Sequence, residues 1–163
     1  MNSKGNGSIS IIIIMMFIIL IIVLPMISIV FENYYVSIVS REIVDASYSS
    51  MTSTFDSINI ANSTKSELNY DTGIESRFRE FLKYNLVLDE SMQSQNEKFQ
   101  NLEIVNFSNI YRGAVDKVSG LTMNRQTIHL EMRVKFKPMF LMSYASDKKT
   151  VDIHFDYEVP IDN

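Results

Sequence analysis

The longest feature of the hydrophobic pattern is an apolar run near the start of the chain. Between Ile9 and Phe31 only two serines and Pro25 interrupt the apolar residues. A run of roughly 20 apolar residues, rising about 1.5 Å per residue in a helix, spans the ~30 Å hydrocarbon core of a bilayer. In lipid a lone segment must satisfy its own backbone hydrogen bonds, which only a helix does. The pattern therefore predicts one transmembrane helix over residues 9–31.

A cleaved secretory signal is the alternative interpretation of this run. The apolar core of a signal is usually about 7–15 residues long and ends at a small-x-small site. The run here is longer, and Ser28-Ile29-Val30 is a poor cleavage site. We therefore expect an uncleaved anchor, kinked near its outer end because Pro25 removes a backbone donor.

A helical pattern continues beyond the apolar run. Tyr35, Val39, Ile43 and Ala46 recur at spacings of four, four and three residues, which places them on one helix face. Such a stripe packs either on the chain's own domain or on the helices of partner subunits, and the spacing is the same in both cases. We therefore expect the helix to extend over residues 32–55, with these four residues as the candidate partner-contact site.

The chain after this helix predicts a small α+β unit. Residues 56–72 are polar, rich in Asn and Ser, and typical of a loop. Thr72 and Glu75 have the spacing of a capping box, and the apolar residues that follow predict a short amphipathic helix ending near Asn85. Alternating apolar and polar residues, the pattern of half-buried strands, then occupy 102–111, 127–137 and 150–159.

The spacing of the strands indicates how they pair. A parallel return usually needs a longer segment than the one between the second and third strands, so we expect antiparallel neighbours with opposite charges such as Arg133 and Asp152 facing each other. The short helix is expected to cover the apolar face of about three strands. The predicted organisation is a cytoplasmic N-terminus (1–8), a transmembrane helix (9–31), a helix extension (32–55), a polar loop (56–72) and an extracytoplasmic α+β domain (73–163).

Charge indicates the orientation of the chain in the membrane. Lys4 precedes the apolar run, whereas all 19 acidic residues and 14 of the 15 basic ones follow it, and the first of them is Glu32. The positive-inside rule then places the N-terminus in the cytoplasm and the domain outside a cell membrane. The segment after the run has a net charge of −5. It is therefore not expected to bind nucleic acid, which requires clustered Lys and Arg.

The sequence offers little catalytic chemistry. It contains no cysteine, which excludes disulfides and thiolate sites, and it has no P-loop, dinucleotide turn or nucleophile elbow. Asp152, His154 and Asp156 lie on one predicted strand face, and antiparallel pairing could place His129 opposite them. This set predicts a solvated strand face in preference to a metal site. We therefore expect no catalytic residues, metal, cofactor or small-molecule substrate, and no enzyme activity.

The order of these features resembles the type IV pilin-like proteins. They too have a short polar N-terminus with a glycine before an apolar helix, which runs on past the membrane to a small sheet. Gly7-Ser8-Ile9-Ser10-Ile11 is similar to the start of TadE-like pseudopilins of tight-adherence (Flp-type) pilus systems. Glu32, Arg41 and Val44-Asp45-Ala46-Ser47 resemble the continuation of their helix, and residues 81–89 resemble a segment of Gram-positive relatives.

One position departs from that family. Pilins and pseudopilins usually carry Glu at the fifth position after the cleaved glycine, where this chain has Ile12 counted from Gly7, or Ser10 counted from Gly5. The resemblance therefore implies either a processed pilin-like subunit or a permanently anchored accessory subunit.

Three functions follow as hypotheses. The first is a non-enzymatic, membrane-anchored component of a bacterial pilus or secretion apparatus, whose partners are membrane lipid and other subunits packed on its N-terminal helix. The second is a stand-alone, single-pass binding or sensor module that acts through its extracytoplasmic sheet. The third, an anchored enzyme, is disfavoured because no convergent polar set is recognisable.

Overall fold

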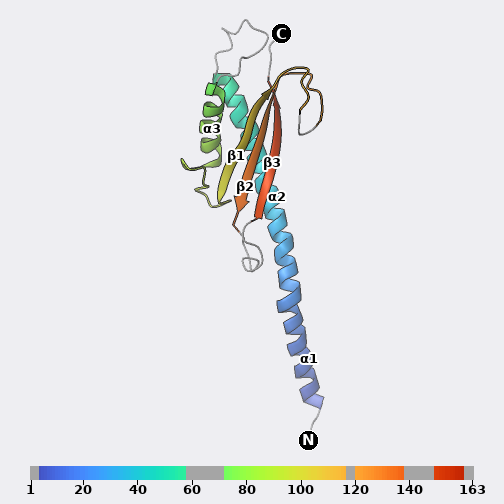
Figure 1. Cartoon of the computed structure of the whole chain (residues 1–163). Helices are drawn as coiled ribbons and strands as arrows, with labels where there is room; N and C mark the ends of the chain where they lie inside the picture. Colours follow the sequence, from blue (N-terminus) through green and yellow to red (C-terminus); the bar gives the residue numbers. More distant parts are fainter. Residues whose placement is uncertain (1–3, 58–71, 117–119, 138–148, 160–163) are drawn as a thin grey trace.

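The computed structural model describes residues 4–57, 72–116, 120–137 and 149–159. A long helix rises into a small domain that contains a second helix and a three-stranded sheet (Figure 1). The fold is therefore α+β, as the sequence predicts. Residues 58–71, most of the predicted polar loop, lie outside the described residues, and the long helix continues to Ser57.

The long helix consists of three consecutive segments. These are α1 (Lys4–Ile18), a π-helical turn η1 (Ile19–Val23) and α2 (Leu24–Ser57). The backbone N–H of Leu24 donates to the carbonyl of Ile19, a bond one residue longer than in an α-helix. The wide turn comes directly before Pro25, which has no N–H to offer the preceding turn. The backbone irregularity beside this proline is thus a π-helical turn.

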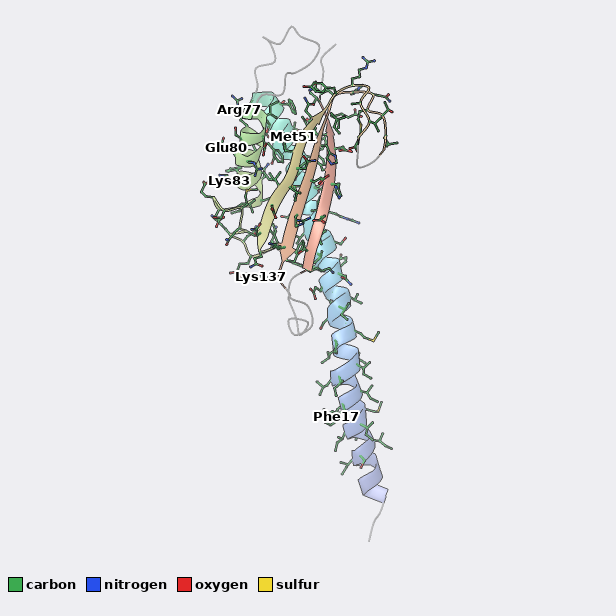
Figure 2. The ribbon with its side chains drawn as sticks, viewed as in Figure 1. Phe17, Met51, Arg77, Glu80, Lys83 and Lys137 are labelled. Carbon is green, nitrogen blue, oxygen red and sulfur yellow. The ribbon has the colours of Figure 1, made fainter. Side chains whose placement is uncertain are left out.

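The apolar side chains in the first half of the long helix are exposed. Within the described residues it is the one helix long and apolar enough to cross a membrane. Phe17 projects from it with 59% of its surface exposed, whereas Met51, further along, is fully buried in the domain (Figure 2). A helix whose apolar side chains are exposed all round is compatible with a single-pass membrane anchor.

The sheet is antiparallel with the order β1-β2-β3. Its strands are β1 (Asn101–Ile110), β2 (Thr127–Phe136) and β3 (Lys149–Glu158), each within one residue of the predicted bounds at both ends. A register shift on β1 between Ile104 and Asn106 is its one irregularity in the pairing with β2. The short helix, α3, spans Thr72–Leu86.

The core lies between the sheet and the two helices. The even-numbered residues of β2, from Ile128 to Phe136, are buried on the inner face of the sheet. Phe78 and Leu82 of α3 are fully buried in the same cluster. Phe55, near the end of α2, stacks on Tyr157 of β3 with ring centroids 5.6 Å apart. The second half of the long helix is therefore part of the core of the domain.

Candidate functional site

The candidate partner-contact stripe on the long helix is used within the chain itself. Val39 and Ile43 are only 3% and 0% exposed, and Tyr35 and Ala46 are partly buried against the same core. The Tyr35 hydroxyl donates to the carbonyl of Lys98, 2.8 Å away, in the segment before β1. The interpretation that assigns Val39 and Ile43 to partner helices is therefore corrected, because both side chains are buried in the chain's own core.

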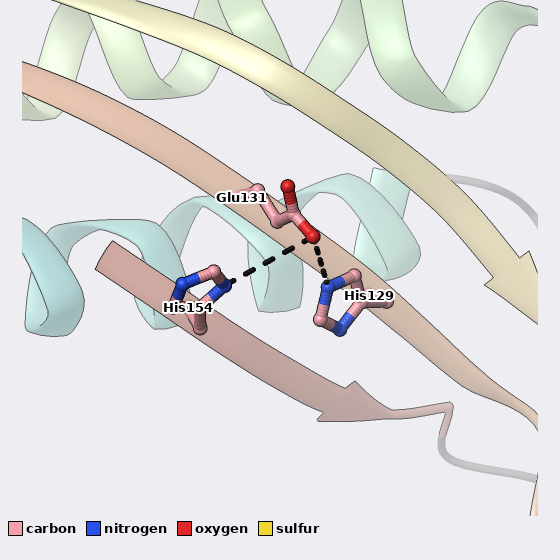
Figure 3. Close-up of side chains that lie close together, drawn as sticks. All are labelled: His129, Glu131 and His154. Carbon is pink, nitrogen blue, oxygen red and sulfur yellow. Dashed lines mark hydrogen bonds and ion pairs between the residues drawn. The ribbon is translucent and has the colours of Figure 1, made fainter. Parts of the chain in front are cut away.

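Charged and imidazole side chains instead gather on the outer face of the sheet, opposite the helices. His129 and Glu131 lie on β2, and they are paired in the register with Asp156 and His154 of β3. Because directly paired residues of antiparallel strands project to the same face, the register brings all four together. Figure 3 shows three of them, with Glu131 between the two imidazole rings.

His129 is the most deeply buried member of this group. Its Nδ1 lies 2.6 Å from Oδ1 of Asp156, and its Nε2 lies 3.2 Å from Oε1 of Glu131. Its side chain is only 3% exposed. The sequence-based expectation of a solvated strand face is therefore wrong for this residue, which is enclosed and bonded through both ring nitrogens.

A two-stranded ribbon in the connection between β1 and β2, with described residues 111–116 and 120–126, explains this burial. Val115 and Thr122 form an antiparallel bridge, and Gly113 and Gly120 adopt positive φ angles of 83° and 70°, which glycine adopts at little cost. Asp116, in the same ribbon, is 2% exposed and has a carboxylate oxygen within 4.8 Å of ligand atoms of both His129 and Asp156. The ribbon thus lies over one end of the outer face.

The surrounding carboxylates determine the charge of His129. Burial by itself would lower the pKa of the imidazole. Hydrogen bonds to Asp156 and Glu131, and the negative charges of Asp156 and Asp116, outweigh this effect and raise the pKa above its ordinary value. The site therefore stabilises a positive charge at this ring.

His154 is the accessible member of the group. Its side chain is 51% exposed, and its Nδ1 lies 4.0 Å from the same Oε1 of Glu131 that faces His129. The two rings are nearly parallel, with centroids 6.3 Å apart and an interplanar angle of 28°. Glu131 is thus shared by a buried imidazole and an exposed one.

The expected charge pairing is confirmed for Arg133 and Asp152. Nε of Arg133 donates to Oδ1 of Asp152, 2.8 Å away, and this hydrogen bond lowers the pKa of the exposed aspartate. A small cleft of about 370 Å³ lies beside His129, lined among others by Tyr111, Val115 and Asp116. Sequence reasoning missed Glu131 and Asp116 because the first was one of several alternating charges and the second lies in a segment without periodicity.

Comparison with known proteins adds no further assignment. No model of a protein family matches the chain, and neither a search of curated proteins nor one of solved structures found a match.

Proposed function

We propose that this protein is a non-enzymatic, membrane-anchored component of a bacterial pilus or secretion apparatus, pilin-like or accessory, that assembles through its N-terminal helix. The observation that supports this most is the continuity of the helix from Ile9 to Ser57, 49 residues without a linker. At about 1.5 Å per residue it is roughly 70 Å long, of which a bilayer core takes up about 30 Å. The remainder is built into the domain.

Continuity matters because it couples the membrane segment rigidly to the domain. A binding module that acts alone needs only a flexible tether between its anchor and its fold. Here the helix that would lie in lipid also carries Ile43 and Met51, which are fully buried in the core. Any packing of the membrane segment against partner helices would therefore fix the orientation of the sheet, as an assembled structure requires.

Partner contacts are expected on the apolar part of the helix and on the side of the helix that faces away from the domain. Val39 and Ile43 lie on the other side and are buried in the chain's own core. Tyr34 and Ile38, at the base of the domain, are 66% and 46% exposed. The resemblance to TadE-like pseudopilins supports the same role, with the N-terminus in the cytoplasm and the domain outside the cell membrane.

Cysteine cross-linking in native membranes tests this function, because the chain has no cysteine of its own. The single substitutions Ile14→Cys and Ile18→Cys lie one helical turn apart in the exposed apolar segment. We expect oxidation to join at least one of them to a second copy or to another pilus or secretion subunit. Tyr84→Cys, at an 83% exposed position of α3, is the control and should give no adduct.

A cysteine scan that gives no cross-link would contradict the proposal. If a scan of all positions from 11 to 22 yields only monomer, the helix is a simple anchor and the protein acts alone. A stand-alone binding or sensor module is then favoured, for which the outer-face cluster around His129 and its adjoining cleft would be the binding surface. Recovery of one copy free of partners in gentle detergent would point the same way.

A further inference from the structure

The two histidines of the chain meet in one place. The sequence contains two histidines and no cysteine, and the fold brings both histidines to the outer face of adjacent strands. They lie far from the membrane segment, toward the end of the sheet where Tyr157 stacks on Phe55 at the end of α2. The donor types of the group, two imidazoles and carboxylates, are those that bind zinc in proteins.

The distances between the donor atoms fit one metal ion. Zinc binds imidazole nitrogen and carboxylate oxygen at about 2.0–2.2 Å, so two ligands of a tetrahedral ion lie about 3.3 Å apart. Oε1 of Glu131 is 3.2 Å from Nε2 of His129 and 4.0 Å from Nδ1 of His154, and all three atoms lie within 4.8 Å of one another (Figure 3). His154 is half exposed and can close the longer gap by a small side-chain movement.

The orientation of the His129 ring is compatible with the same set of donor atoms. Asp156 accepts a hydrogen bond from Nδ1, which leaves the lone pair of a neutral ring on Nε2. That lone pair faces Oε1 of Glu131, which is also an acceptor. Two acceptors in contact require a cation between them, either a proton or a metal ion. Metal-ligating histidines commonly have a carboxylate on the other ring nitrogen, the place that Asp156 occupies here.

We propose that Nε2 of His129, a carboxylate oxygen of Glu131 and Nδ1 of His154 bind one zinc ion. Asp156 is the positioning residue that holds the His129 ring, and the fourth coordination position faces solvent beside the exposed His154 ring. Two histidines and one carboxylate with an open fourth position are a set that zinc adopts in proteins. The site depends only on the fold of the sheet and is independent of the proposed assembly role.

The test is calorimetric titration of Zn²⁺ into the full chain, purified in detergent without a histidine tag and stripped with a chelator. We expect one equivalent to bind. His154→Ala and Glu131→Gln should weaken binding at least tenfold, since even the outer-shell partners of metal ligands contribute about 10–100-fold. Asp152→Asn removes a carboxylate from the same strand face at a residue bonded to Arg133, and it should leave zinc affinity unchanged.

Folding and coordination are monitored separately. His154 is half exposed and its ion-pair contact with Glu131 is 4.0 Å long, so its substitution should leave the near-ultraviolet circular dichroism of the tyrosines unaltered. Co²⁺ in place of Zn²⁺ should give the intense visible absorption of a tetrahedral site, which His154→Ala should abolish.

Two outcomes overturn the proposal. One is the absence of zinc binding to the unsubstituted chain. The other is binding that is equally strong in His154→Ala, which would assign the ion to the alternative set of Asp116, His129 and Asp156.

Discussion

At the scale of single residues, His129 makes the stability of the domain depend on pH. Its pKa is raised in the folded protein by Asp156 and Glu131, so protonation favours folding. This contribution is complete below the pKa of the unfolded chain, about 6.5, and is lost as pH rises through the folded value. With a chelator present, we expect the urea midpoint to fall as pH rises above about 6.5.

Two substitutions isolate this effect because the chain has two histidines. His129→Gln should flatten the dependence, whatever its absolute stability, whereas His154→Gln should retain it. The slope of midpoint against pH is the measurement. Equal slopes in the unsubstituted protein and in His129→Gln would show that the carboxylates do not stabilise the charged ring.

At the scale of elements, the part of α2 that lies against the domain has two faces with different roles. Ile43 is fully buried beneath the sheet, while Ile38, five residues earlier, is 46% exposed. Ile43→Ala should reduce the free energy of unfolding by about 2–5 kcal/mol, because it removes buried methyl groups and leaves a cavity. Ile38→Ala should change it by about 0.5 kcal/mol or less, as at other surface sites.

Urea unfolding of the full chain in detergent, followed by near-ultraviolet circular dichroism, measures both changes. The two substitutions delete the same atoms from the same helix, so each serves as the control for the other. A loss at Ile38 as large as that at Ile43 would mean that the helix is rotated relative to the sheet from the arrangement described here.

The elements also show which parts of the fold could be predicted. Strict alternation gave the bounds of β2 and β3, because a sheet with one buried face imposes a period of two. The spacing of Val39 and Ile43 also predicts their common helix face. Spacing alone does not show whether the chain's own domain or a partner subunit covers that face. The burial of His129 was not predictable, because the ribbon that covers it, with Asp116 and Gly120, has no period of its own.

At the scale of the whole molecule, one helix determines the placement of everything else. The apolar segment and the core share the helix Ile9–Ser57, so an apolar segment that crosses a membrane would place Lys4 and the domain on opposite sides of it. Lys4 precedes the segment, and the first basic residue after it is Arg41. The positive-inside rule then predicts an extracytoplasmic domain.

Single cysteines and a membrane-impermeant maleimide test this prediction on intact cells, with no background from the chain itself. Tyr84→Cys, at an 83% exposed position, should be labelled at once, and Asn2→Cys only after the membrane is permeabilised. The reverse pattern would place the domain in the cytoplasm and remove the basis for a role in an external structure. The proposed zinc site would be unaffected, because it requires only that β2 and β3 pair.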